Sequence, residues 1–347
     1  MFGAEKLRIL AWSVTISTVL SSCSSEQISR EIHGETQGTT YSIILVGDYE
    51  VDKTEIDSIF SVFDRSLSTY IDSSVVSRLN NSLESTEIND PSGFFNECYK
   101  RSMEIYLQTG GVFDPSVFPL VKGWGFMNDI ETPLTQLEVD SILAFVSFEK
   151  DKHHAIDFDN NVIHYIKNHP GFKLDFNAIA QGFSVDVIDR FLREKGCENY
   201  YIEVGGEIVV KGYNADGVKW RIGIDTPVEN LDSRELENII HISDKAIATS
   251  GNYRKYYIHD GVKYAHTLDP KTGFPVQHSL LSATVVANDC ATADAYATVF
   301  MVLGVDRSMD FLKNHPEAEI EVYLLYSNEK GEISREISKG FSEFLKE

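Results

Sequence analysis

The sequence contains few cysteines and no cysteine pattern that would bind a metal. Only 4 occur in 347 residues, and Cys98, Cys197 and Cys290 form neither a CxxC motif nor a Cys/His spacing. A disulfide framework needs several pairs, and a structural zinc site needs clustered thiolates or imidazoles. We therefore expect neither. The three side chains are expected to be buried and to pack as small apolar groups.

Basic residues are also scarce. The chain carries 31 Lys and Arg against 53 Asp and Glu, which gives a formal net charge of −22 at pH 7. Such a charge disfavours binding to nucleic acid or to anionic lipid surfaces, so no nucleic-acid partner is expected. An anionic ligand would have to be held by backbone dipoles, by a cation or by a few placed side chains.

No apolar run is long enough for a transmembrane helix, which needs about 20 residues. The apolar segment from Ile9 to Leu20 follows Lys6 and Arg8 and has the length of a secretory signal. The sequence LSSC, ending at Cys23, has the pattern of a bacterial lipoprotein cleavage site, with Cys23 as the acylated lipid anchor. We expect an exported protein, lipid-anchored to a bacterial membrane and facing the periplasm or the cell exterior. Ordinary signal cleavage beside an incidental cysteine is the alternative.

The rest of the chain mixes helices and hairpins without regular βαβ alternation, which favours an α+β fold over a doubly wound sheet. We find no internal repeat. Helices are predicted over 52–67, 94–108, 135–148, 177–195 and 291–303. Strands are predicted over 37–45, 154–158, 162–166, 200–210, 220–225 and 282–287, with hairpins over 246–266 and 319–337. The strand 200–210 is interrupted by two glycines, where backbone could approach a ligand.

The stretch LDFNAIAQGFSVD, Leu174 to Asp186, places a helix start at a point suited to phosphate. Asn177 is the expected N-cap, which would leave the next backbone N–H groups unpaired. Such an end carries a partial positive charge that suits a pyrophosphate. Asp175 stands beside it, and a metal ion between this carboxylate and the phosphate would reconcile the two charges.

A second stretch, ATADAYAT from Ala291 to Thr298, carries a carboxylate and a hydroxyl on one helix face. Asp294 and Thr298 are four residues apart, and both are hard oxygen donors of the kind that Mg²⁺ prefers. Each also has a purely structural explanation. Asp is favoured in a first helical turn, and Thr often bonds back to its own helix.

Two further segments are candidates for ligand contact. The aromatic, turn-rich run from Val112 to Phe126 is either a core loop or the wall of a planar ligand's site. His266 ends a predicted strand just before the turn formed by Asp269 to Gly273. Its imidazole can serve as a base near neutral pH, or it can simply be satisfied at the end of a hairpin.

Taken together, these motifs resemble the ApbE family, the FAD:protein FMN transferases once described as thiamine biosynthesis lipoproteins. The resemblance covers nearly the whole mature chain. It implies a mixed, largely antiparallel α+β fold with packed helices and a cleft between two lobes. Residues 1–22 would be the signal peptide, 23–31 a tether and 32–347 a single catalytic domain. The matching segments, in the family's order, are QGTTYS (37–42), STYIDSSVVSRLN (68–80), TGGVFDPSVFPLVKGWGF (109–126), LDFNAIAQGFSVD, EVGGE (203–207), ATSGNYRKYY (248–257), HTLDPKTGFPV (266–276) and ADAYAT (293–298).

The resemblance also implies an activity and a set of site residues. FAD would bind with Mg²⁺, FMN would pass to a Thr or Ser hydroxyl of an exported flavoprotein, and AMP would be released. The metal ligands would be the carbonyl of Ala178 and the side chains of Asp294 and Thr298. His266 is the candidate base or phosphate donor. The residues expected to contact FAD are Gln37, Tyr70, Val112, Phe113, Asp114, Asp175, Gln181 and His266.

This chain departs from the family at two of these positions. Gln37 stands where the family often has Met, and Gln181 where it often has Lys. Replacing a lysine removes a point charge from the phosphate region, whereas a Gln amide can still donate hydrogen bonds. The substitution at Gln181 is therefore expected to tune affinity or rate.

Two other functions fit the same residues. With water in place of the acceptor hydroxyl, the site would make a Mg²⁺-dependent FAD pyrophosphatase that yields FMN and AMP. The second alternative is a non-catalytic, lipid-anchored module that binds flavin or serves in adhesion. The retention of both Asp294 and Thr298 speaks against it.

Overall fold

The computed structural model describes residues 28–127, 132–227, 235–253 and 255–346. The predicted signal peptide and Cys23 lie outside them. Within the described part of the chain, no helix is both long and apolar enough to cross a bilayer. The last residues assigned to the tether, 29–31, instead begin strand β1, because Glu31 and its neighbours pair with the strand that follows.

An eight-stranded sheet is the largest sheet in the described part of the chain. Every strand pairing in the described residues is antiparallel, which confirms the predicted α+β class with largely antiparallel sheets. The sheet order is β1 (Ser29–Thr36), β2 (Thr39–Val46), β6 (Tyr200–Val204), β7 (Glu207–Lys211), β10 (Lys245–Gly251), β13 (Leu280–Ala287), β14 (Glu321–Ser327) and β15 (Ile333–Ile337).

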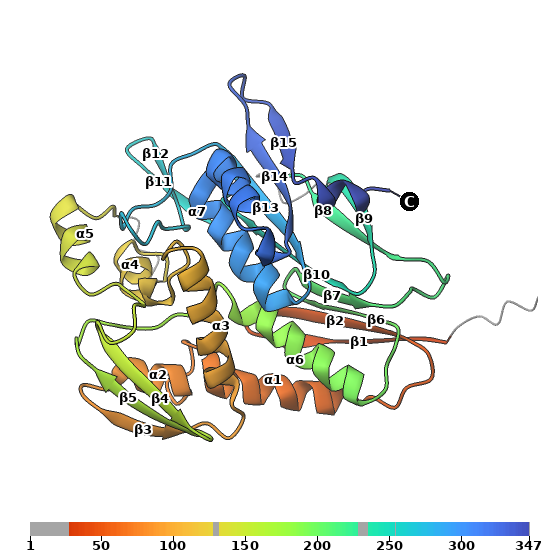
Figure 1. Cartoon of the computed structure of the whole chain (residues 1–347), viewed down its shortest axis with the longest axis horizontal. Coiled ribbons are helices and arrows are strands. Elements are labelled where there is room, and N and C mark those ends of the chain that lie inside the picture. The colour runs from red at the N-terminus through yellow and green to blue at the C-terminus, as the bar shows by residue number, and fades with distance from the viewer. Residues whose placement is uncertain (1–27, 128–131, 228–234, 254, 347) are drawn as a thin grey trace, which may run out of the picture.

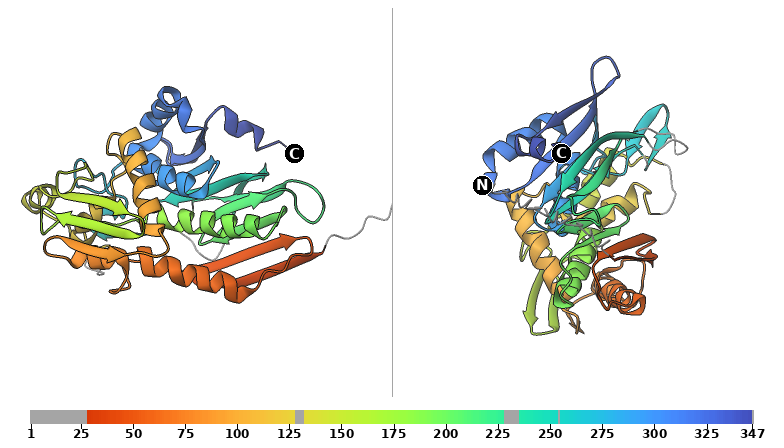
Figure 2. Two further views of the ribbon diagram at one scale, coloured as in Figure 1. Left: turned by 60° about the horizontal axis from the view of Figure 1, so that its bottom comes forward. Right: turned by 90° about the vertical axis from the view of Figure 1, so that its right-hand side faces the viewer.

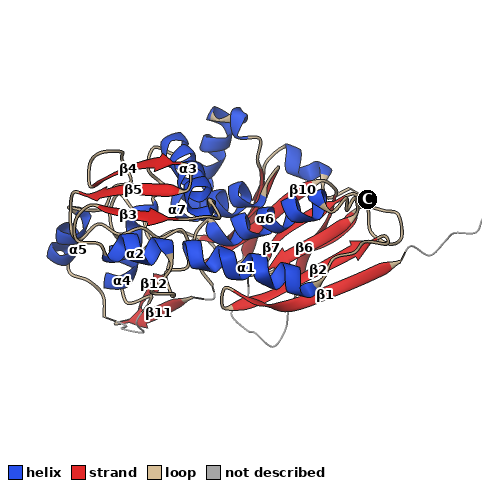
Figure 3. Cartoon of the chain, turned by 90° about the horizontal axis from the view of Figure 1, so that it is seen from below, coloured by secondary structure: helices blue, strands red, loops and turns tan. Residues whose placement is uncertain are grey.

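Two helices, α6 (Ala180–Glu194) and α7 (Cys290–Asn314), pack on one face of this sheet. Strand alternation explains the arrangement, because Ala246 and Ala248 of β10 face the helices while Ile247 faces the opposite side. The opposite face is covered by the hairpin of β8 (Trp220–Asp225) and β9 (Leu236–Ile242). Figure 3 shows α1 (Lys53–Leu67) and α6 lying across the strands, and Figure 2 shows α1 alongside β1.

The remaining elements gather at the other end of the molecule (Figure 1). One large core cluster joins the two parts, because it includes Tyr165 of the small sheet and Val285 and Leu324 of the large one. The small sheet has the order β3 (Thr86–Asn89), β5 (Val162–Lys167) and β4 (His154–Asp159). Around it lie α2 (Val75–Asn81), α3 (Phe94–Gln108), α4 (Phe118–Gly123), α5 (Gln136–Leu143) and the hairpin of β11 (Tyr256–His259) and β12 (Val262–Ala265).

Several predicted elements have different bounds in the structure, and four differences are the most informative. The strand predicted over 200–210 is the hairpin β6–β7, because Gly205 and Gly206 take φ values of 61° and 114° and form its turn. The helix predicted to close at Gly304 bends there and runs on to Asn314. The helix predicted over 135–148 keeps its capping box at Thr135 but ends at 143. The first strand of the 246–266 hairpin divides into β10 and β11.

The three cysteines outside the predicted signal region are free and buried, which confirms that they pack as small apolar groups. Burial raises the pKa of the Cys98 thiol far above its ordinary value. Such thiols are poor nucleophiles, and we assign them no chemistry.

A fully buried histidine of the small sheet, His154, makes the stability of the fold depend on pH. Its ring is stacked 4.5 Å from the ring of Phe172, and its Nε2 lies 2.7 Å from the hydroxyl of Tyr99. Burial lowers the pKa of His154 to about 4. The unfolded chain, with an ordinary pKa of about 6.5, therefore binds more protons than the folded chain between these values.

The consequence is a loss of stability in acid. The contribution of neutral His154 is complete above pH 6.5 and falls as the pH drops toward 4, and we expect a loss of roughly 2.5 kcal/mol at pH 4.5. Urea unfolding at pH 7 and pH 4.5 measures it. His154→Phe preserves the stacking and cannot protonate, so its stability should change less between the two pH values. An equal change in both proteins would contradict the assignment.

Candidate functional site

The first turns of α6 and α7 meet and satisfy each other's backbone groups. The N–H of Gly182 in α6 donates to Asp294 Oδ2 at 3.0 Å. In return, Asp186 of α6 accepts from the N–H groups of Cys290 and Ala291 at 2.7 and 2.9 Å. A helix start lacks intrahelical partners for its first N–H groups, so each helix caps the other. The crossing thereby fixes the position of Asp294.

The start of α6 differs from the sequence prediction. The helix begins at Ala180, its N-cap position is occupied by Ile179, and Asn177 lies outside it. The N–H of Asn177 donates to Asp175 Oδ1 at 2.8 Å. Asp175 is buried, and burial raises its pKa to about 6. Asn177 as N-cap was therefore wrong, and two of the N–H groups near this end already bind carboxylates.

Asp294 and Glu207 form a buried acidic pair beside this helix start. Burial raises the pKa of Asp294 to about 7. Burial, and then the charge of Asp294, hold the pKa of Glu207 well above its usual range. Thr298 Oγ1 lies 3.4 Å from Ser250 Oγ on β10, which leaves it only a weak partner. Ala178, whose carbonyl was the third predicted ligand, lies two residues before α6.

This donor set fits a magnesium ion better than a transition metal. Among the described residues, no group of three or more His, Cys, Asp or Glu side chains could hold a metal ion. Mg²⁺ needs only one or two carboxylates and completes its shell with water and phosphate oxygens. A buried Asp294 with a neighbouring carboxylate and hydroxyl meets that requirement.

The side chain of Gln181, in the first turn of α6, reaches the β6–β7 turn, and Gln37 lies in the β1–β2 turn. Gln181 Nε2 donates to the carbonyl of Val204 at 2.9 Å, and a Cβ on Gly205 would lie 1.8 Å from that nitrogen, so a larger residue there would displace the Gln181 amide. Gln37 and Gly38 form the β1–β2 turn, with φ values of 51° and 74°. Gln37 Nε2 is buried without a hydrogen-bond partner. Such an unpaired donor is costly unless a ligand satisfies it.

The predicted contacts at Val112, Phe113 and Asp114 are only partly open to a ligand. The ring of Phe113 is buried in the main core, and the Asp114 carboxylate accepts from the N–H groups of Ser116 and Phe148 at 2.7 and 3.2 Å. These two side chains have structural roles, whereas Val112 is half-buried. The N–H of Asp175 donates to the carbonyl of Pro115 at 2.7 Å, which joins the segment to the start of α6.

His266 follows β12 and is poised as a neutral imidazole. Its Nδ1 lies 3.0 Å from the carbonyl of Lys255. A carbonyl only accepts, so Nδ1 carries the proton and Nε2 keeps a free lone pair. Burial lowers the pKa of His266, which favours the neutral form. The Lys255 ammonium has a smaller effect on the pKa of both His266 and Asp175.

Tyr70 makes no described contact with the other predicted site residues. It lies between α1 and α2, is 75% exposed, and its N–H donates to Ser68 Oγ at 3.3 Å. An exposed ring of this kind can cover a planar ligand, but no described contact joins Tyr70 to the residues above.

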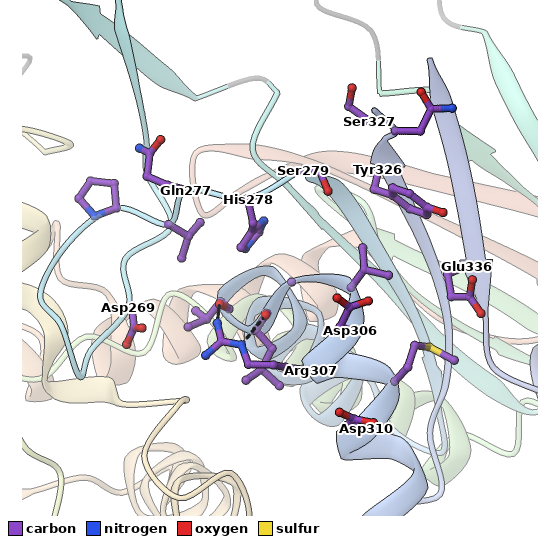
Figure 4. A pocket seen from close by; sticks show the side chains of 18 of the residues that line it. Asp269, Gln277, His278, Ser279, Asp306, Arg307, Asp310, Tyr326, Ser327 and Glu336 are labelled. Carbon is purple, nitrogen blue, oxygen red and sulfur yellow. Dashed lines mark hydrogen bonds between the residues drawn. The ribbon is translucent and has the colours of Figure 1, made fainter. Parts of the chain in front are cut away.

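A separate cavity of about 1040 Å³ lies at the bend of α7 (Figure 4). Its wall includes Asp269 of the loop that follows His266, but none of the residues predicted to bind FAD or metal. At the bend, Gly304 interrupts the helix, and Arg307 donates to the carbonyls of Val302 and Leu303 at 3.0 and 2.8 Å. These polar groups therefore stabilise the bend.

The structure also shows site residues that the sequence did not single out. Gly182 permits the helix crossing, and Glu207 adds a second buried acid. Glu207 stands at the end of the EVGGE segment, two residues before Val209 on the helix-covered face of β7. A carboxylate at a strand position that faces the core, where an apolar side chain is normal, is the sequence signal that could have identified Glu207.

At the crossing of α6 and α7, a methyl group added to Gly182 is expected to lower the stability of the fold. In Gly182→Ala the new Cβ would lie 2.3 Å from the carbonyl oxygen of Cys290 and 2.7 Å from the Cβ of Asp294. Backbone has to shift to accommodate it, so we expect the free energy of unfolding to fall by about 2 kcal/mol. Urea unfolding measures this change.

Gly123→Ala in α4 is the matched control. There the nearest atoms to the new Cβ are the side-chain ends of Ile142 and Leu134, at 2.9 and 3.1 Å, which can move. Its stability should change by less than about 1 kcal/mol. If Gly123→Ala is the more destabilised variant, the interpretation of the α6–α7 crossing is wrong.

Comparison with known proteins gives one consistent family. The model of the ApbE family matches residues 37–324. An FAD:protein FMN transferase from Vibrio cholerae serotype O1 is 34% identical over 346 residues, covering 96% of this chain and 98% of that protein. The FAD:protein FMN transferase of Haemophilus influenzae is 31% identical and covers 94% of each chain.

Solved structures agree. The flavin transferase ApbE from Vibrio cholerae superposes with a TM-score of 0.78 at 34% identity, covering 92% of this chain and 100% of that one. The flavinyl transferase ApbE from Pseudomonas stutzeri, in its apo form, gives a TM-score of 0.79 at 28% identity, covering 92% of this chain and 97% of that one.

Proposed function

This chain belongs to the ApbE family and is an FAD:protein FMN transferase. We propose that it uses Mg²⁺ to transfer FMN from FAD to a Thr or Ser hydroxyl of an exported flavoprotein. AMP would be released in the same reaction. The observation that carries the magnesium requirement is buried Asp294, which has no ion pair with a described Lys or Arg and stands at the start of α6. A buried carboxylate of this kind needs a compensating cation.

The reaction is a phosphoryl transfer in which charge must be neutralised and the groups held in line. Asp294, together with Thr298 and the Ala178 carbonyl as neutral ligands, would hold Mg²⁺, which would supply positive charge to the pyrophosphate of FAD. The acceptor hydroxyl oxygen bonds to the phosphorus of the FMN moiety, and the bond from that phosphorus to the AMP oxygen breaks. The hydroxyl proton passes to Nε2 of His266, whose neutral form is favoured by burial.

Around the phosphates of FAD, the neutral amides of Gln37 and Gln181 would donate hydrogen bonds where a charged side chain could otherwise stand. Gln37 has a buried, unpaired Nε2 that can donate to FAD. Gln181 Nε2 donates one of its two N–H groups to the Val204 carbonyl, so the other can donate to a phosphate. A neutral donor where the family often carries lysine supports a tuning role at Gln181.

The proposal includes export and attachment to a bacterial membrane through acylated Cys23. Strand β1 begins at Ser29, so the intervening chain can span at most about 21 Å when extended. The β1–β2 side of the domain would then remain close to the bilayer. An acceptor domain would have to present its Thr or Ser hydroxyl near that surface.

Mass spectrometry of a candidate acceptor domain tests the function. The purified protein is incubated with FAD and Mg²⁺, with and without the acceptor, and AMP and free FMN are followed in parallel. Transfer predicts an FMN-sized mass gain on the acceptor and AMP release that depends on it. Equal release of free FMN and AMP without acceptor would favour the pyrophosphatase, and FAD binding without AMP release would favour a non-catalytic module.

A further inference from the structure

Glu207, the first residue of β7, has a buried carboxylate that the proposed reaction does not use. Its side chain is only 9% exposed, and its Oε2 has no hydrogen-bond partner among the described residues. Burying an acceptor without a partner is costly, so such an oxygen points to a ligand. We propose that Glu207 is the second carboxylate of the Mg²⁺ site at Asp294, an assignment that rests on the function proposed above.

The strand places Glu207 on the correct face. Side chains alternate along β7, and Val209 packs in a cluster with Val185 of α6 and Cys290 of α7. Ile208 instead packs on the opposite face against Trp220. Glu207 shares the face of Val209, so its carboxylate points toward the crossing of α6 and α7.

The helix places Asp294 next to it. Cys290 Sγ lies 3.6 Å from the carbonyl oxygen of Ile208, the residue after Glu207. Asp294 follows Cys290 by four residues and therefore lies one turn along the same helix face. The charge of Asp294 also acts on the pKa of Glu207, second to burial, as expected for neighbouring carboxylates. The two acids thus flank the first turn of α6.

No described cation compensates this pair. Neither Glu207 nor Asp294 forms an ion pair with a Lys or Arg in the described part of the chain. Arg101, a partly buried cation beside the same two helices, binds Asp289 and Asp186 instead, at 2.7 and 3.3 Å. Two buried carboxylates without a counter-ion favour a divalent cation, and Mg²⁺ takes one or two protein carboxylates.

Calorimetric titration of Mg²⁺ into EDTA-stripped protein without FAD tests the assignment independently of activity. Glu207→Gln keeps the side-chain volume and removes the charge, and it should weaken Mg²⁺ binding by about tenfold or more. Glu203→Gln is the matched control. Glu203 pairs with Ile208 across the β6–β7 hairpin, so both side chains lie on the face of the sheet away from α6 and α7. The Glu203 carboxylate accepts from the N–H of Gly206 at 2.7 Å. An amide oxygen can keep that bond, so its Mg²⁺ affinity should stay within about twofold of the wild type.

Asp294→Asn separates this inference from the proposed function. If Asp294→Asn loses Mg²⁺ binding while folded Glu207→Gln binds as tightly as the wild type, the role of Glu207 is overturned and the site at Asp294 stands. If neither variant changes the affinity, the proposed metal site itself is wrong. Urea unfolding in EDTA checks folding, and Glu207→Gln should be at least as stable as the wild type because a buried like charge is removed.

Glu207→Asp provides a second test should the glutamine variant not fold. It keeps the charge on a shorter side chain, so its Mg²⁺ affinity should lie below that of the wild type. In folded variants it should also exceed that of Glu207→Gln. Wild-type affinity in Glu207→Asp, or weaker binding than in Glu207→Gln, would contradict a ligand role that depends on both reach and charge.

Discussion

Asp294→Asn is expected to lower kcat/KM for FMN transfer by about 10³-fold, because Mg²⁺ at the proposed site would supply several kcal/mol of charge stabilisation to the transition state. Asparagine retains an acceptor oxygen for the N–H of Gly182, which lies 3.0 Å from the wild-type carboxylate. The start of α6 should therefore remain capped while the charge is lost. AMP release and the mass gain on an acceptor, measured across a series of Mg²⁺ concentrations, give the size of the effect.

Asp310→Asn is the control for this substitution. Asp310 is an exposed residue of the same helix and lines the cavity at the bend (Figure 4). The chemical change is identical, but the site is distant from the α6–α7 crossing, so activity should be close to that of the wild type. If AMP release by Asp294→Asn continues unchanged at limiting Mg²⁺, Asp294 is not the metal carboxylate.

His266→Gln is expected to lower kcat on the order of 10³-fold with FAD affinity nearly unchanged, since general base catalysis typically contributes 10²–10⁴-fold. Glutamine can still donate to the Lys255 carbonyl, which His266 contacts at 3.0 Å, but it cannot accept a proton. Single-turnover transfer and FAD titration separate rate from binding. His164→Gln, at an exposed position paired with Glu87, should leave both unchanged.

The pH profile gives an independent check on His266. Burial lowers its pKa, so the neutral base should persist below the ordinary histidine value of about 6.5. At saturating Mg²⁺, which would keep the Asp294 carboxylate ionised, transfer should therefore be flat above pH 6.5 and fall only at lower pH, and His266→Gln should lose this acid limb. An unchanged limb in the variant, or FAD affinity lost together with rate, would make His266 a binding residue rather than the base.

Local patterns in the sequence determined much of the fold. The helix predicted over 94–108 has the same bounds as α3, and the capping box at Thr135 begins α5 as expected. Both depend on residues within one or two turns of each other, where side-chain periodicity and caps act directly. The order of the family motifs likewise identified the chain as a transferase of FMN.

The meeting of distant segments was decided by the tertiary structure. Asp294 caps α6 from more than a hundred residues away, and Glu207 faces it only because β7 presents alternate side chains to α7. Asp114, predicted to contact FAD, caps a short 3-10 helix at Pro115–Val117. Local periodicity identifies a residue's own helix or strand face, but which distant group it meets depends on helix crossing and strand register. The sequence by itself therefore determined the family and many of the elements, whereas the packing of α6, α7 and β7 decided which carboxylates meet.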